Sequence, residues 1–253
     1  MAHEDPSLTA IPILDFRAAS IAKLIDGRGW RDLSDTDKIG AVYDFVRNEI
    51  LFGYNRFDDI PASEVLSDGY GQRNTKGTLL MALLRAVGIK CRIHGFTIHK
   101  GLQRGVVPEF VYPIAPEEIL HSWIEVDLGG RWINVEGFIL DNAFLKVLQS
   151  SFADREILCG YGAGTDCLSA PPVEWTGQDT YIQETGIVQD FGAFDTPDAF
   201  YAEHEQNFGR LRGWLYRNII RHWMNVRVRA FRAGRLKPDA AIAHQHEGET
   251  HAA

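Results

Sequence analysis

Three positions in the first half of the chain have the spacing of a site for nucleophilic catalysis. A glycine-punctuated turn, "DGYGQRNTKG", leads directly into an apolar-striped helix, so that Arg73 stands at a helix N-terminus. At that place, unpaired N–H groups and the helix dipole lower the pKa of a thiol and stabilise an oxyanion. His121 begins a predicted strand, and Glu136 lies 15 positions later on the partner strand of a hairpin. If they lie side by side, the imidazole is a general base and the carboxylate orients it.

Arg73 itself cannot be the nucleophile of such a site. An arginine is protonated at pH 7, so it is neither a base nor a nucleophile. A cation at the positive end of an exposed helix dipole also costs about 0.3–1 kcal/mol. We expect Arg73 instead to repel a protonated His121, or to hold Glu136 or the carboxylate of a substrate in a bidentate pair.

The predicted helices and strands bring these positions together. A helix capped by Asp35 or Thr36 is indicated by apolar residues at helical spacing: Ile39, Val42, Phe45 and Val46. A second helix is predicted over residues 75–88, with Gly88 as its C′ residue. Residues 89–98 read as a strand, and residues 121–128 and 131–138 alternate around a Gly-Gly turn as a hairpin.

The remainder of the chain is predicted to surround this core. Residues 142–205 are rich in glycine, proline and aspartate, which indicates an extended and partly irregular wrap. Residues 206–236 predict a basic amphipathic helix, and residues 237–253 a disordered tail. Since no repeat or linker divides the chain, we expect one α+β domain over residues 1–205, with its core at 38–141.

The order and spacing of these stretches resemble the transglutaminase-like superfamily, whose fold is related to that of papain-type cysteine proteases. The resemblance covers residues 38–141 and is carried by "GYGQRNTKGTLLMALLRAVGIKCRIHGF" and "HSWIEVDLGGRWINVEG". The family has a cysteine at the start of the helix, then "ALLRAxGIxxR", then "H-x-W-x-E-V", a short turn, a tryptophan and an acid. The chain resembles a bacterial-type single-domain member in which arginine occupies the catalytic cysteine position.

Carried over by position, the resemblance implies a site residue by residue. The nucleophile position falls on Arg73, the general base on His121 and the orienting acid on Glu136, where the family usually has aspartate. The oxyanion side of the pocket would be formed by Gln72, Asn74 and Tyr70. The implied fold is a helix packed on an antiparallel sheet, here with a C-terminal helical extension.

The resemblance also implies a reaction class. The family acts on amide- or peptide-type carbonyls of peptides, proteins or small amides, by cysteine hydrolysis or by acyl transfer through a thioester. With Arg73 at the nucleophile position we expect no thiol-based turnover, so the leading hypothesis is an inactive or non-standard member. One alternative is a binding module whose cleft uses Arg73 as an anion clamp. Another is a hydrolase in which His121 and Glu136 activate water.

Three further residues offer alternatives to this site. Asp141 is a second candidate for the acid that orients His121. Cys159 and Cys167 flank "GYGAGTD", where a relocated nucleophile or a small disulfide is conceivable, whereas Cys91 falls in a strand and is expected to be a buried apolar side chain. We expect no cofactor and no metal.

Charge is distributed unevenly along the chain, whose net charge is −8. Residues 209–235 hold eight arginines and no acid, which leaves 18 basic against 34 acidic residues elsewhere, a balance of −16. The apolar stripe of this basic helix consists of Leu211, Trp214, Leu215, Ile219, His222 and Val226. The stripe either docks on the domain or meets an anionic partner or membrane surface. Nucleic acid is not expected, because the rest of the protein is acidic.

The N-terminus and the cysteine content point to a compartment. The start, "MAHEDPSLTAIPILDF", has neither a basic n-region nor a long apolar run, so no signal peptide is predicted. No stretch of about 18 uncharged apolar residues predicts a membrane span. Three cysteines are too few, and odd in number, for a disulfide framework. We therefore expect a cytoplasmic protein.

Overall fold

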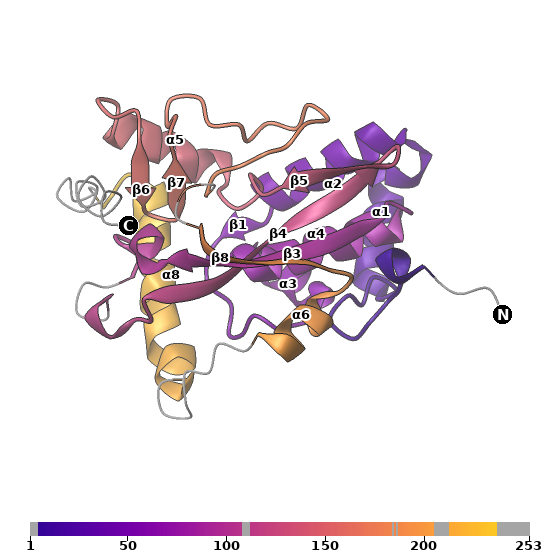
Figure 1. Ribbon diagram of the computed structural model, residues 1–253, viewed down its shortest axis with the longest axis horizontal. Coiled ribbons are helices and arrows are strands. Elements are labelled where there is room, and N and C mark those ends of the chain that lie inside the picture. Colours follow the sequence, from indigo (N-terminus) through magenta and orange to yellow (C-terminus); the bar gives the residue numbers. More distant parts are fainter. Residues whose placement is uncertain (1–4, 108–111, 184, 186, 205–212, 237–253) are drawn as a thin grey trace.

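A four-stranded antiparallel sheet forms one layer of the protein, with its strands in the order β5–β4–β3–β8. The computed structural model describes residues 5–107, 112–183, 185, 187–204 and 213–236 (Figure 1). The sheet strands are β3 (Cys91–His99), β4 (Glu118–Leu128), β5 (Arg131–Val135) and β8 (Ile187–Phe194). The tight Gly129–Gly130 turn, with both glycines at positive φ, closes the predicted hairpin between β4 and β5.

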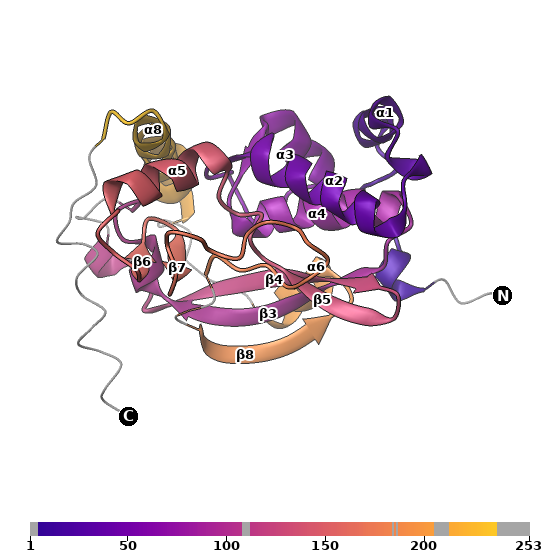
Figure 2. The ribbon, with the colours of Figure 1, turned by 90° about the horizontal axis from the view of Figure 1, so that it is seen from above.

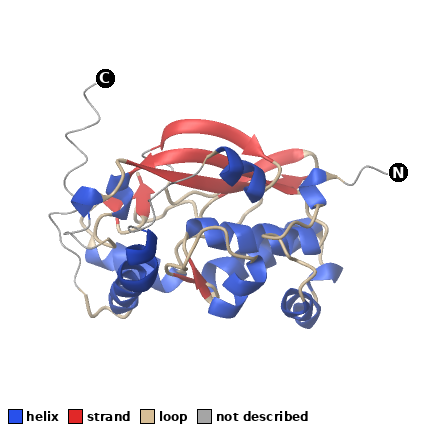
Figure 3. Ribbon diagram, turned by 90° about the horizontal axis from the view of Figure 1, so that it is seen from below, coloured by secondary structure: helices blue, strands red, loops and turns tan. Residues whose placement is uncertain are grey.

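A layer of helices covers one face of this sheet (Figures 2 and 3). Its members are α1 (Ala19–Arg28), α2 (Asp35–Asn48), α3 (Ala62–Asp68) and α4 (Arg73–Ala86). All of α4 except its last residue is buried, because the helix lies between the sheet and the other helices. A Cβ at Gly77 would lie 3.4 Å from the Ile124 side chain of β4, an ordinary contact distance, so α4 packs directly on the sheet there.

The ends of α2 and α4 differ in detail from the predicted ends. α4 begins at Arg73 instead of residue 75, and Gly88 follows it at φ +85° as the expected C′ residue. The N-cap of α2 is Ser34, whose Oγ accepts from the amide of Asp37 at 3.3 Å. The prediction of Asp35 or Thr36 as the cap was wrong by one or two residues, because both candidates already lie in the first turn.

The segment predicted as an irregular wrap contains regular structure. It holds α5 (Asn142–Ser151), the paired strands β6 (Leu158–Gly160) and β7 (Ala163–Thr165), β8 and α6 (Pro197–Glu203). β8 pairs with β3 and so completes the main sheet. The prediction missed β8 because its sequence, "IVQDFGAF", does not alternate; the strand is mostly exposed and pairs with β3 through two register shifts.

Smaller elements connect these layers. β1 (Leu51–Phe52) and β2 (Tyr70–Gly71) form a parallel pair before α4. Short 3₁₀-helices occupy Pro6–Leu8, Trp30–Asp32, Lys100–Gln103 and Tyr112–Ile114. α6 packs on β3 at Gly95, because a Cβ at that position would lie 2.1 Å from the ring of Phe200.

The basic segment near the C-terminus is helical over its described residues, 213–232, with a π-helical turn at Tyr216–Ile220 before α8 (Arg221–Arg232). Of the two alternatives for the apolar stripe, docking on the domain was wrong, because Trp214, Ile219, His222 and Val226 are exposed. α8 docks instead through the stripe Met224, Val228 and Phe231. Leu211 and the predicted tail, residues 237–253, lie outside the described residues.

The mixed architecture confirms the predicted fold class, with a helix layer on an antiparallel sheet and a C-terminal helix. None of the helices in the described ranges has the length and apolar composition needed to span a bilayer.

Candidate active site

Arg73 turns its side chain into the protein at the first position of α4. The residue is 4% exposed, and its guanidinium lies against the Phe96 ring, with Cζ 4.8 Å from the ring centroid. All three nitrogens donate within the chain: Nε to the Ser122 carbonyl at 2.5 Å, Nη1 to Gln183 Oε1 at 2.7 Å, and Nη2 to Glu136 Oε1. Burial lowers the pKa of Arg73 to about 10, against the opposing attraction of Glu136, so Arg73 remains a cation at pH 7.

Glu136 is fully buried just after β5, and all of its recorded partners are inside the protein. One carboxylate oxygen accepts from Arg73, and the other accepts from the backbone amides of Ile182 and Gln183 at 2.7 and 2.9 Å. A buried ion pair is tolerated when its remaining lone pairs are hydrogen-bonded in this way. Arg73 and Glu136 therefore join α4, the end of β5 and the segment before β8.

His121 lies on β4, and the structure does not pair it with Glu136 as predicted. Nδ1 lies 2.9 Å from the Leu120 carbonyl oxygen, so this nitrogen carries the hydrogen and donates. No hydrogen bond joins His121 to Glu136 in the part of the chain that the structure describes. The Arg73 guanidinium, which reaches from α4 to the carboxylate, takes that place.

Burial and charge keep the His121 imidazole neutral. Desolvation is the main cause that lowers its pKa well below the ordinary value, and the nearby Arg73 cation is the second. Hydrogen bonds to Leu120 and Gln183 oppose the shift but do not cancel it. Because Glu136 is paired with Arg73 and the guanidinium lies nearby, the imidazolium form that a thiolate–imidazolium pair needs is disfavoured at His121.

The residues predicted to line the oxyanion side have other partners. Gln72 bridges the backbone amide of Asn55, at 2.6 Å, and the carboxylate of Asp58, at 2.8 Å. Asn74 Oδ1 accepts from the Ser122 hydroxyl at 3.3 Å, and the Tyr70 carbonyl accepts from the Asn55 amide group at 3.1 Å. These groups tie the loop before α3 to the N-terminus of α4.

The hydrogen-bond partners of Asp141 in the described structure do not include His121. Asp141 caps α5 by accepting from the Phe144 amide at 2.9 Å, and it pairs with Arg232 of α8 at 2.6 Å. The expectation of Asp141 as an alternative orienting acid is therefore wrong, because its carboxylate anchors α8 to the domain.

The three cysteines are free thiols. Cys91 is buried as expected, and burial raises the pKa of Cys91 to about 11. Burial likewise raises the pKa of half-buried Cys159 to about 11, which disfavours the thiolate that a relocated nucleophile needs. Cys167 is exposed.

Sequence reasoning missed three residues that shape the site. Gln183 contacts Arg73 and Glu136 from a segment 47 residues beyond Glu136, and Ser122 contributes only its backbone carbonyl to Arg73. Lys76, one turn after Arg73, is fully buried and donates to the carbonyls of Arg47 and Ile139 at 3.2 and 3.0 Å. Neither local periodicity nor motif spacing signals such contacts.

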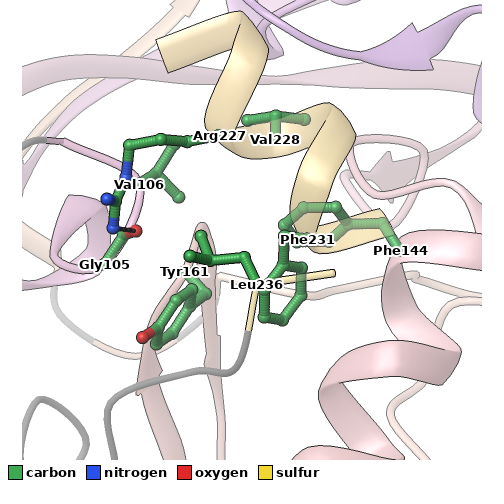
Figure 4. Close-up of a pocket in the computed structure, with 8 residues that line it drawn as sticks. All are labelled: Gly105, Val106, Phe144, Tyr161, Arg227, Val228, Phe231 and Leu236. Carbon is green, nitrogen blue, oxygen red and sulfur yellow. Dashed lines mark hydrogen bonds between the residues drawn. The ribbon is translucent and has the colours of Figure 1, made fainter. Parts of the chain in front are cut away.

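A shallow apolar pocket lies elsewhere in the fold. It is lined by Gly105, Val106, Phe144, Tyr161, Arg227, Val228, Phe231 and Leu236, between α5, α8 and the β6–β7 turn (Figure 4). None of the predicted site residues lines it. Within the described ranges, no three His, Cys, Asp or Glu side chains are arranged to hold a metal ion.

Part of the chain matches one family model, and part of its fold is similar to a solved structure. The family model of the transglutaminase-like superfamily matches residues 28–137, which include Arg73, His121 and Glu136. No curated protein matches the chain. The crystal structure of a presumed cysteine protease from Cytophaga hutchinsonii is similar, with a TM-score of 0.40 and 16% identity over 54% of this chain and 42% of that chain. The chain therefore spans less than half of that protein. Its residues 28–137 are similar to the transglutaminase-like superfamily.

Proposed function

We propose that the chain is a transglutaminase-like protein that performs no cysteine-dependent hydrolysis or acyl transfer at the family's nucleophile position. The observation that carries the proposal is the buried ion pair between Arg73 and Glu136. The resemblance implies a cysteine at position 73 in active members, and a guanidinium has no thiol to attack an amide carbonyl. Position 73 thus holds a structural cation.

The surroundings of Arg73 support a structural role. A small thiol at position 73 would leave Glu136 free to orient His121, whereas the guanidinium occupies the carboxylate and the Ser122 carbonyl at once. The residue is only 4% exposed, so a peptide carbonyl cannot reach it in this conformation. The pair between Arg73 and Glu136 joins α4, the end of β5 and the segment before β8. This role stabilises the fold and requires no catalytic turnover.

The hydrogen bonds of Arg73 disfavour the alternative in which its guanidinium binds an anionic ligand. A ligand carboxylate would have to displace Glu136 or Gln183, because each guanidinium nitrogen already donates within the chain. The displaced Glu136 would then be a buried and unpaired charge, which costs about 3–5 kcal/mol.

A second candidate, hydrolysis by water that His121 activates, is favoured by one observation. The lowered pKa of His121 keeps the imidazole neutral at pH 7, and a general base must be neutral to accept a proton. This activity would be lost in His121→Ala and would survive complete alkylation of the three cysteines.

The proposal is tested by incubating the full chain with amide and peptide substrates and with an acyl-donor probe, followed by mass-spectrometric mapping of labelled residues. We expect neither turnover nor acylation of any cysteine in the unaltered chain. Arg73→Cys should react faster than Arg85→Cys, a matched control from the other end of α4 that is also buried. Acylation of a native cysteine that depends on His121 would contradict the proposal.

A further inference from the structure

His94 of β3 connects the two neighbouring strands of the sheet through its imidazole ring. Nδ1 lies 2.8 Å from Glu125 Oε1 on β4, and Nε2 lies 2.7 Å from Asp190 Oδ1 on β8. An ionised carboxylate accepts hydrogen bonds but donates none, so both contacts are hydrogen bonds only if both ring nitrogens carry a hydrogen. The geometry therefore requires the imidazolium form of His94.

The groups around His94 also favour its protonated form. The ring stacks on Trp123 with centroids 4.5 Å apart, and Arg92 donates to the other oxygen of Glu125 at 2.5 Å. Burial opposes protonation and is the largest single influence, but the hydrogen bonds to Glu125 and Asp190 and the charges of these two acids outweigh it and raise the pKa of His94. The charged groups of this cluster are thus Arg92 on the same strand, Glu125 on β4 and Asp190 on β8.

The contact with Asp190 crosses a bulge in the ladder between β3 and β8. Gly95 lies opposite Gly192, whereas Phe96 lies opposite Asp190, so the register shifts between these two residues of β3. A bulge disrupts backbone pairing locally. β8 is also the edge strand of the main sheet, next to β3 (Figure 2). The pair between His94 and Asp190 therefore holds β8 on the sheet where its backbone pairing is interrupted.

The two carboxylates are held to different degrees. The Glu125 side chain is 8% exposed and also pairs with Arg92, whereas the Asp190 side chain is 60% exposed. When the imidazole loses a proton, one ring nitrogen presents a lone pair to a carboxylate oxygen, and that contact becomes repulsive. The exposed carboxylate can turn into water, so the contact between His94 and Asp190 is the one that breaks.

We propose that His94 is a proton-dependent latch for β8, which the imidazolium form closes and the neutral ring opens. The latch contributes its full stability below the unfolded pKa of about 6.5, and this contribution is lost as the pH rises through the folded pKa, which lies above that value. Opening is local, because β3, β4 and β5 pair without β8. It frees β8 together with α6, since Phe200 of α6 packs on Phe191 and Phe194 of β8.

The first measurement is an NMR titration of the imidazole nitrogens in the full chain. We expect both nitrogens of His94 to carry a hydrogen at pH 6, and the ring to titrate above its ordinary value of about 6.5. A ring that titrates at or below that value, or that carries a single hydrogen at pH 6, would overturn the proposal.

The second measurement is amide hydrogen exchange of β8 at pH 6 and pH 9, corrected for the intrinsic exchange rate. The protection of β8 amides relative to those of β5 should fall at least about threefold over this range, since opening releases a proton. His94→Gln should abolish the fall because it has no titratable ring. Asp190→Asn should also abolish it, since an amide can bond either form of the ring, while His94 still titrates beside Glu125. An equal fall in β5, or an unchanged fall in either variant, would contradict the latch.

His204→Gln is the matched control, because a second histidine touches β8 at the end of α6. The His204 ring stacks on Phe191 with centroids 3.9 Å apart. This variant should keep the fall in protection between pH 6 and pH 9, and loss of the fall would assign the titration to His204 and overturn the proposal. If His94→Gln does not fold, the exposed substitution Asp190→Asn decides the test.

Discussion

The Arg73 guanidinium donates from Nη2 to Oε1 of Glu136, and both side chains are buried. Because the second carboxylate oxygen accepts from two backbone amides, this pair is closed to further partners within the described structure. Glu136, which the resemblance implies as the partner of His121, is thus paired with Arg73 instead. This relationship has consequences that can be measured in the folded chain.

His121 is expected to remain neutral at pH 6, because burial, and secondly Arg73, lower its pKa well below the ordinary value. An NMR titration of the imidazole carbons measures this directly. In Arg73→Met the pKa should rise, since one of its two lowering causes is removed. An imidazole that titrates near pH 6.5 in the unaltered chain would show that the site is open to solvent.

The lowered pKa of His121 also predicts that the folded protein becomes less stable as the pH falls. The folded pKa lies below the unfolded value of about 6.5, so the unfolded state takes up the proton first. The contribution of His121 to the free energy of unfolding is therefore fully present above the unfolded pKa. As the pH is lowered from about 6.5 to the folded pKa, this contribution decreases by up to about 1.4 kcal/mol per pH unit. His121→Gln should remove that part of the slope in urea unfolding.

Because of Lys76, we expect the free energy of unfolding to depend on pH above neutrality. Burial lowers the pKa of Lys76 to about 7, mainly through desolvation. Between that value and the unfolded value of about 10.4 the unfolded state binds one more proton, so stability rises with pH. The free-energy difference between Lys76→Met and the unaltered chain should therefore shift by about 1.4 kcal/mol per pH unit over this window, in favour of the unaltered chain.

Lys23→Met, at an exposed position of α1, serves as the control for Lys76→Met. Urea unfolding at pH 7 and pH 9 compares the two variants. If the Lys76→Met difference is the same at both pH values, the ammonium is not desolvated in the folded chain.

Gly95 is expected to be intolerant of a side chain. A Cβ there would lie 2.1 Å from the Phe200 ring, so Gly95→Ala should destabilise the protein by about 1–3 kcal/mol and displace α6. Gly27→Ala, in α1 with open space around it, should be neutral or stabilise by up to about 1 kcal/mol. Equal stability of the two variants would show that α6 does not pack on β3.

Periodicity was sufficient to predict α2, α4 and the β4–β5 hairpin, because each buries one regular face on the core. β8 could not be predicted, since it is an exposed edge strand that depends on β3 for its pairing. The docking face of α8 could not be chosen from the sequence either. The helix has apolar side chains on two sides, and a π-helical turn at Tyr216–Ile220 interrupts the α-helical period.

Two contacts were predicted among the positions of the site. The pair between Arg73 and Glu136 is present, through Nη2 alone instead of a bidentate contact, whereas the pair between His121 and Glu136 is not present in the described structure. Spacing placed Arg73, His121 and Glu136 on α4, β4 and the end of β5, where the structure has them. Which two of the three would pair depended on the reach of an arginine side chain and on Gln183, a residue from a distant loop. No local pattern carries that information.

The most direct test of the structural role of Arg73 is a double-mutant cycle of Arg73→Met and Glu136→Gln, measured by urea unfolding at pH 7. Each single variant leaves a buried charge unpaired and should lose about 3–5 kcal/mol. The double variant should lose less than the sum, with a coupling energy of about 1–3 kcal/mol. The exposed pair Arg56–Glu64 should give no more than about 1 kcal/mol as a control. Additivity within about 0.5 kcal/mol at Arg73 and Glu136 would contradict the account.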